Sequence, residues 1–281
     1  MANYTPIPEI QALVPLLTRD VDQIKKEDWQ RVKENLKRFN DPHPEVSIVM
    51  IARNEERFIF ASLASIAMLD TPKRVQFLVV NNNSTDRTQE ILDRLEVKSL
   101  FEEKSGWAEA RQRGLEEAKA EIVITCDSEN LYPSTWVDTL SKPLFEDDKV
   151  VVTCAQYCFY TFNNEYSPFM QVYQNFRLVN SIIRHPKRPH LNCLGGNMAY
   201  KRLIALEAGG YEFGIGRGED GGLAYRMSSF GELKFVKSKK AYSYSSLRNV
   251  TKEGTLWDAF AQRIKNHSSR ILENLTPLKQ K

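Results

Sequence analysis

Short apolar runs alternate with helical patterns through the middle of the chain. The apolar runs lack the polar alternation of a strand with one solvated face, and they occupy residues 46–51, 75–80, 121–125 and 149–157. In the segments between them, apolar residues recur at helical spacing over residues 55–69, 84–95 and 107–119. Strands that alternate with helices in this way predict βαβ units and a mostly parallel sheet flanked by helices.

Helical patterns also flank this alternating region. An amphipathic pattern ends near Asn40, where Pro42 and Pro44 prevent a helix from continuing. A second amphipathic pattern carries Trp257 and Ile271 near the end of the chain. We therefore expect one α/β domain over residues 45–248, with an N-terminal helical extension (residues 1–44) and a C-terminal basic amphipathic helix (residues 249–281).

The composition is that of an ordinary soluble globular chain. Of the 281 residues, 42% are hydrophobic and 27% are charged, values that exclude disordered and disulfide-scaffold proteins. The first residues lack the basic start and apolar stretch of a secretory signal, and four cysteines in such a chain indicate reduced thiols. We expect a cytoplasmic protein.

Charge excludes one class of function and leaves another open. The 39 basic and 36 acidic residues give a net charge of +3, which is too balanced for a dedicated nucleic-acid-binding protein. The excess is concentrated after residue 233, where eleven basic residues face three acidic ones. One interpretation of this tail is a solvated face. The other is a surface that binds an anionic membrane or a phosphorylated substrate. Membrane binding would place the protein peripherally at the inner face of the membrane.

Polar residues follow three of the predicted strands directly. Because the carboxyl ends of parallel strands meet at one edge of a sheet, these groups are expected to build one polar cleft. Turn chemistry alone would explain any single group, but not all three at successive strand ends. The groups are Arg53 to Glu55, Asn81 to Asp86, and Asp127 to Asn130.

Asp127 and Glu129 are the sharpest feature among these groups. Two carboxylates separated by one residue repel each other unless a cation lies nearby. A divalent ion such as Mg²⁺ or Mn²⁺ takes one or two carboxylates together with phosphate oxygens. The alternative is a turn whose acid caps the following helix.

Several residues elsewhere suit a binding cleft. Arg111, on a predicted helix, could bind a diphosphate with its fork of donors, or be an ordinary surface arginine. Asp220, with Glu219 beside it, follows a glycine-rich loop and is either a helix cap or a general base. Gly195 and Gly196 allow a backbone to approach a ligand closely.

A cationic loop between two prolines adds a further candidate. Residues 184–190 include Arg184, Lys187 and Arg188, together with two histidines. Such a loop could close over a donor diphosphate or hold a phosphorylated lipid acceptor. A proline-rich exposed loop with incidental charge is the alternative.

From about residue 45 to residue 248, the order and spacing of six segments resemble the inverting, nucleotide-sugar-dependent glycosyltransferases of family 2, which have the GT-A fold. The resemblance implies that a nucleotide-binding part (residues 45–130) precedes an acceptor part (residues 131–248). It also implies single addition to a saccharide or lipid-linked acceptor, since the arginine- and tryptophan-containing motif of processive synthases is absent. The segments are VSIVMIARNEE, LVVNNNSTDRT, GWAEARQRG, ITCDSEN, GGNMAYKR with the later GGY, and GRGEDGGLAYRM.

The resemblance also implies a role for each matched residue. Asp220, with Glu219, would be the catalytic base, and Asp127 with Glu129 would bind the metal. Gly195, Gly196 and Asn197 would lie on the acceptor side. The donor-binding residues would be Ile51, Arg53, Glu55, Asn81, Asn83, Arg111, Asp127 and Ser128.

Three positions depart from the family pattern. Asn81 stands where an aspartate is usual, so a carboxylate contact to the nucleotide is missing. Glu129 replaces a second aspartate, and Gln112 replaces an asparagine. A catalytically inactive, nucleotide-binding module is therefore the alternative function. Dinucleotide oxidoreductases and nucleotidyltransferases are disfavoured, because the glycine-rich loop that each has after its first strand is absent.

Overall fold

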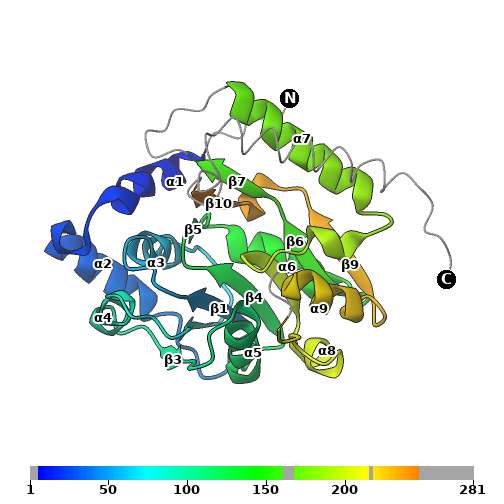
Figure 1. Ribbon diagram of the computed structural model, residues 1–281, viewed down its shortest axis with the longest axis horizontal. Coiled ribbons are helices and arrows are strands. Elements are labelled where there is room, and N and C mark those ends of the chain that lie inside the picture. The colour runs from blue at the N-terminus through cyan, green and yellow to red at the C-terminus, as the bar shows by residue number, and fades with distance from the viewer. Residues whose placement is uncertain (1–5, 161–167, 215–217, 247–281) are drawn as a thin grey trace.

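A seven-stranded sheet forms the centre of the protein (Figure 1). The computed structural model describes residues 6–160, 168–214 and 218–246. The sheet has the strand order β3-β2-β1-β4-β8-β6-β9. Its strands are β1 (Val46–Ala52), β2 (Val75–Asn81), β3 (Ser99–Phe101), β4 (Ile122–Asp127), β6 (Val150–Ala155), β8 (Asn197–Lys201) and β9 (Glu232–Val236).

The helices lie on both faces of this sheet and at its margins (Figure 1). Those of the N-terminal half are α1 (Pro8–Leu13), α2 (Lys26–Leu36), α3 (Ile59–Ala67), α4 (Thr88–Arg94) and α5 (Trp107–Glu117). Those that follow are α6 (Trp136–Glu146), α7 (Pro168–Arg184), α8 (Arg202–Glu207) and α9 (Glu219–Met227).

The central strands are buried on both faces, which explains why they read as continuous apolar runs. Alternate side chains of β1 enter two different cores, because successive side chains of a strand point to opposite faces. Ile48 and Met50 belong to the core that contains α2, α3 and α6. Val49 and Ile51 belong to the core beneath α5 and α9.

The predicted mostly parallel α/β sheet is confirmed, with one antiparallel interruption. Strands β1, β2, β3 and β4 are parallel neighbours, whereas β8 runs antiparallel to both β4 and β6. The sequence pattern did not predict β8. A second, three-stranded sheet with the order β5-β10-β7 lies beside the first. It consists of β5 (Asn130–Leu131), β7 (Tyr157–Tyr160) and β10 (Ser243–Ser246).

The N-terminal segment packs onto the sheet's helices. Helices α1 and α2 both contact α3, and the rings of Trp29 and Phe60 lie 4.7 Å apart. Arg94, the last residue of α4, stacks on Trp29, and its guanidinium carbon lies 3.9 Å from the ring centre. The predicted C-terminal helix, with Trp257 and Ile271, lies outside the described residues.

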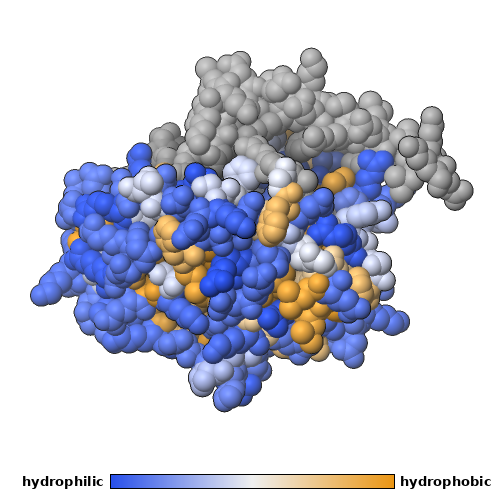
Figure 2. Space-filling view, turned by 60° about the horizontal axis from the view of Figure 1, so that its bottom comes forward, coloured by the Kyte–Doolittle hydropathy of each residue, from blue (hydrophilic) through white to orange (hydrophobic). Residues whose placement is uncertain are grey.

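The surface is mainly hydrophilic on the face shown in Figure 2, where apolar areas are small and separated by polar ones. Of the helices in the described ranges, none has the length and apolar content that crossing a bilayer requires.

Candidate functional site

The carboxyl ends of β1, β2 and β4 lie side by side, as the sequence predicted. In the registers of these strands, Ile51 is the neighbour of Asp127, and Ala52 is the neighbour of Asn81. The polar groups that follow the three strands therefore start from one edge of the sheet. This is the edge at which open α/β sheets bind their ligands.

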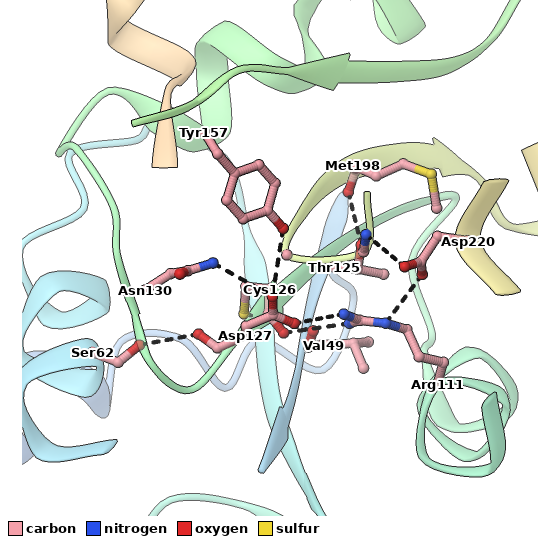
Figure 3. A network of polar contacts seen from close by, with 12 residues as sticks. Val49, Ser62, Arg111, Thr125, Cys126, Asp127, Asn130, Tyr157, Met198 and Asp220 are labelled. Atoms are coloured by element: carbon pink, nitrogen blue, oxygen red, sulfur yellow. Dashed lines mark hydrogen bonds and ion pairs between the residues drawn. The ribbon is translucent and has the colours of Figure 1, made fainter. Parts of the chain in front are cut away.

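Asp127 ends β4 and lies at the centre of a polar network (Figure 3). Its Oδ1 accepts a 2.6 Å hydrogen bond from Nη2 of Arg111. Its Oδ2 accepts two long ones, of 3.4 Å from the Tyr157 hydroxyl and 3.5 Å from the Asn130 side chain. About 30% of the side chain is exposed. One carboxylate oxygen is thus tightly paired, and the other keeps capacity for a ligand.

Arg111 lies between two carboxylates that are far apart in the sequence (Figure 3). Its side chain comes from α5 and is only 3% exposed. Besides pairing with Asp127, its Nε is 3.3 Å from Oδ1 of Asp220. Burial alone would lower the pKa of Arg111, but Asp220 and Asp127 together raise it well above its ordinary value. Arg111 is therefore a permanently charged bridge, not a surface residue.

Asp220 is the second residue of α9, and its carboxylate points into the same network. Its Oδ2 accepts a 2.7 Å hydrogen bond from the main-chain N–H of Gly195. The side chain is 13% exposed. Burial raises the pKa of Asp220 to about 7, helped by the charges of Glu219 and Asp127 and opposed by Arg111 and the Gly195 N–H. A carboxyl group with this pKa can exchange a proton near neutral pH.

Gly195 and Gly196 let the main chain lie directly against these charged groups. A Cβ on Gly195 would be 2.3 Å from Oδ1 of Asp220 and 2.4 Å from Nη2 of Arg111. A Cβ on Gly196 would be 2.0 Å from Oδ2 of Asp127. The close approach that the glycines were predicted to allow is made to the protein's own carboxylates.

The residues predicted to contact the donor occupy different depths. Arg53 and Asn83 are exposed, and Glu55 is half-buried. Ile51 is 8% exposed and belongs mainly to the core. Asn81 is only 1% exposed, and its amide donates to Gln89 and accepts from the N–H of Ser84. Asn81 therefore holds the loop after β2.

Two further predicted residues are less accessible than expected. Ser128 is 4% exposed, and Asn197 is fully buried. The Asn197 amide accepts from the indole of Trp136 and donates to the carbonyls of Gln156 and Ala241. These bonds tie β8 to surrounding segments, so the Asn197 amide is fully engaged within the protein.

Two tyrosines in the network were missed by the sequence analysis. The hydroxyl of Tyr132 accepts from the Asp127 N–H and donates to the Gly196 carbonyl. Tyr157 comes from β7, and its hydroxyl donates to Oδ2 of Asp127. No local motif distinguishes them. Tyr132 follows Asp127 closely in the chain, whereas Tyr157 is brought to Asp127 by β7.

The carboxylates at the sheet edge are suitable ligands for a divalent cation, but they do not form a complete coordination shell. Within the described residues, no cluster of three or more histidine, cysteine or acidic side chains is positioned to hold a metal. Oδ2 of Asp127 and the half-buried Glu129 nevertheless offer carboxylate oxygens at the sheet edge. Mg²⁺ and Mn²⁺ ordinarily need only one or two carboxylates when substrate phosphates and water supply the rest.

Comparison with known proteins decides the family. The family described as "Glycosyl transferase family 2" matches residues 47–208, which include the sheet edge, Arg111, Asp127 and the Gly195 segment. The chain belongs to this family. Asp220 and α9 lie beyond the matched region, so their role is argued from geometry.

A curated relative agrees with the family, and the match covers only part of that protein. Glycosyltransferase GlyA of Streptococcus pneumoniae is 25% identical over 241 residues, which cover 78% of this chain and 34% of that protein. The chain thus spans about a third of the length of this relative.

Solved glycosyltransferase structures share the fold. The mannosyltransferase PcManGT from Pyrobaculum calidifontis, in complex with GDP-Man and Mn²⁺, is 20% identical with a TM-score of 0.56. That match covers 96% of this chain and 77% of the other. S. aureus TarS 1-349 in complex with UDP-GlcNAc is 18% identical, with a TM-score of 0.57 and coverage of 84% and 68%. At these identities the likeness confirms the GT-A fold.

Proposed function

We propose that this protein transfers one sugar from a nucleotide-sugar donor to an acceptor hydroxyl, with inversion at the anomeric carbon. The observation that carries the proposal is Asp220, whose carboxylate is joined through Arg111 to Asp127 at the carboxyl edge of the sheet. Arg111 is thus a buried cation between Asp220, which could accept a proton, and the sheet edge at which an activated sugar would bind.

The donor would lie along the ends of β1, β2 and β4. Exposed Arg53 and Asn83 and half-buried Glu55 line the side on which a nucleotide would bind. The diphosphate would lie toward Asp127, beside the positive charge of Arg111. PcManGT and TarS, which share this fold, were solved with GDP-Man and UDP-GlcNAc. They support the class of donor but do not specify the sugar.

Asp220 would act as the general base. The acceptor oxygen attacks the anomeric carbon from the face opposite the diphosphate, and its proton passes to the Asp220 carboxylate as the new bond forms. The bond between the anomeric carbon and the diphosphate oxygen breaks, and the electron pair leaves with the nucleoside diphosphate. A single displacement of this kind inverts the configuration.

A divalent cation would be held by Asp127 and Glu129. When bound, it would supply positive charge to the departing diphosphate. Arg111 contributes from the protein side, because it holds Oδ1 of Asp127, whereas Oδ2 makes only long hydrogen bonds.

The test is release of nucleoside diphosphate from a panel of nucleotide sugars, with product configuration read by NMR. We expect Asp220→Asn to lower kcat by about 10²- to 10⁴-fold, the usual contribution of a general base, with donor affinity retained. Glu212→Gln is the matched control, because Glu212 is an exposed acid that pairs with Arg226.

Three results would contradict the proposal. They are full activity in Asp220→Asn, retention of configuration, and tight donor binding without turnover on any acceptor. The last would favour the inactive nucleotide-binding module that the Asn81 substitution keeps open.

A further inference from the structure

A long part of the chain beside the proposed base contains no acidic residue. Between Glu165 and Glu207 there is no aspartate or glutamate, whereas six lysines and arginines occur there. Three of the six, Arg184, Lys187 and Arg188, fall within five residues of one another. This stretch of chain is therefore cationic in itself, even though the whole chain is nearly neutral.

The fold places this cationic segment next to Asp220. After α7, the short helix η3 (Pro189–Asn192) packs against α9, the helix that carries the base. The carbonyl oxygen of His190 is 3.4 Å from the position of a Cβ on Gly221, the residue after Asp220. The ring of His190 lies 5.0 Å from that of Tyr225, one turn along α9.

The segment is held in this position by its own hydrogen bonds. Nε of Arg184 donates to Oδ1 of Asn192, and the Asn192 amide donates a 2.9 Å bond to the carbonyl of Ser181. The N–H of Arg188 donates a 2.8 Å bond to the carbonyl of Arg184. The chain then continues to Gly195, whose N–H holds Asp220. Hydrogen bonds thus fix the cationic segment, and the chain that follows it holds Asp220 through Gly195.

The histidines of the segment add no charge at neutral pH. Burial lowers the pKa of His190 below its ordinary value, and Arg188 and Arg184 lower it further. Burial likewise lowers the pKa of His185. The positive charge of the segment therefore belongs to its arginines and Lys187.

We propose that the acceptor carries a phosphate group, which segment 184–190 binds while the acceptor hydroxyl reaches Asp220. This inference rests on the proposed function and names its acceptor class. Arg188 and the exposed Lys187 would contact the phosphate oxygens. Arg184, which donates to Asn192, would hold the segment in position. Guanidinium and ammonium groups are the usual partners of phosphate, and charge-assisted bonds to it are among the strongest in water.

The phosphate could belong to a soluble molecule or to a lipid. Exposed apolar side chains flank the segment, namely Ile183, Leu191 and Leu194, which are 39%, 41% and 43% exposed. Apolar residues beside cations also suit the headgroup region of an anionic membrane. The phosphate chemistry is the same in both cases, so the experiment separates the two sources.

The experiment compares acceptors that differ only in phosphate. Glycerol is tested against sn-glycerol 3-phosphate, and ribitol against ribitol 5-phosphate, each as acceptor and as a ligand that protects against thermal unfolding. Vesicles of phosphatidylglycerol are tested against vesicles of phosphatidylcholine. Each arm uses the full chain, the double variant Lys187→Gln/Arg188→Gln, and the control Lys142→Gln/Lys149→Gln, which removes two exposed lysines outside the segment.

We expect the phosphorylated member of a pair to be bound or used at least roughly tenfold better, the factor that about one charge-assisted bond supplies. The Lys187/Arg188 variant should lose this preference while donor hydrolysis without acceptor stays unchanged, and the control should keep it. Preference for glycerol 3-phosphate over vesicles would assign a soluble source, and the reverse a lipid.

Equal binding of the paired compounds, or a preference that survives in the Lys187/Arg188 variant, would overturn the inference. With donor hydrolysis intact, that result leaves the proposed function standing. Absence of donor hydrolysis in the full chain would count against the proposed function itself.

Discussion

The main-chain N–H of Gly195 donates a 2.7 Å hydrogen bond to Oδ2 of Asp220. The bond connects the chain just before the antiparallel strand β8 to the first turn of α9. It fixes the carboxylate in the orientation from which Oδ1 faces Arg111. The site therefore depends on a backbone contact that only a residue without a side chain allows.

Gly195→Ala should disrupt this contact. An added Cβ would lie 2.3 Å from Oδ1 of Asp220 and 2.5 Å from Nε of Arg111, distances that require one of these groups to move. Because displacement of about 1 Å at a reacting group can cost ~10²-fold in rate, we expect nucleoside diphosphate release to fall by about that factor. Gly221→Ala is the control, since its Cβ would meet only the His190 carbonyl at 3.4 Å. Equal activities of the two variants would contradict the prediction.

Activity should rise with pH through the neutral range. Burial raises the pKa of Asp220 to about 7, and a protonated carboxyl group cannot accept the acceptor's proton. The value of kcat/KM should therefore fall about tenfold per pH unit below the pKa and level off above it. A pH series of nucleoside diphosphate release measures this. A profile that is flat from pH 5 to pH 8 would show that Asp220 is not the base.

Stability should respond to pH in the opposite direction. Between the ordinary pKa of 3.8 and about 7, the folded protein holds a proton on Asp220 that the unfolded chain releases. The contribution of this group to the free energy of unfolding therefore decreases as pH rises, by at most about 1.4 kcal/mol per pH unit. Denaturant unfolding of the native protein and of Asp220→Asn, measured over a range of pH, isolates this contribution. The difference between the two should change across this window and stay constant above it.

Arg111→Met should be strongly destabilising. Arg111 is 3% exposed, and its removal leaves Asp127 and Asp220 near each other without their shared cation. Removal of one partner from a buried ion pair typically costs about 3–5 kcal/mol. Arg113→Met is the control on the same helix, because Arg113 is 41% exposed and pairs with Glu117 at the surface. That pair should contribute less than about 1 kcal/mol. Similar losses in both variants, measured by urea unfolding, would argue against a bridging role.

Asn81→Asp restores the acid usual in the family, and we expect it to lower stability. Asn81 is 1% exposed and donates a 2.7 Å hydrogen bond to Oε1 of Gln89. A carboxylate has no donor for this oxygen, and Nε2 of Gln89 is already bonded to Asp93 and Ser99. Leaving a buried acceptor unpaired costs about 1–3 kcal/mol.

Asn83→Asp is the matched control for this change, because Asn83 is exposed and its amide makes one long bond of 3.4 Å. Its melting temperature should stay close to that of the native protein. A normal melting temperature in Asn81→Asp as well would mean that the loop after β2 tolerates either residue, and the substitution would then bear on ligand binding alone.

Much of the sheet could be predicted because its strands are buried on both faces. The predicted runs at 46–51 and 75–80 match β1 and β2 to within a residue. Strand β8 could not be predicted, since its five residues follow two glycines and show no pattern that separates them from a loop. The helix predicted from Glu55 begins only at Ile59, because a turn at the sheet edge comes first.

Local sequence determined the apolar strands, their alternation with helices and the polar residues at the strand ends, because each depends on neighbours within a few positions of the chain. Tertiary structure alone decided that Arg111 bridges Asp127 and Asp220, that Tyr157 reaches Asp127, and that Asn197 is buried. These contacts join residues from β4, α5, β7, β8 and α9. They exist because β8 runs antiparallel between β4 and β6 and thereby carries Gly195, and with it α9, to the edge where β4 ends.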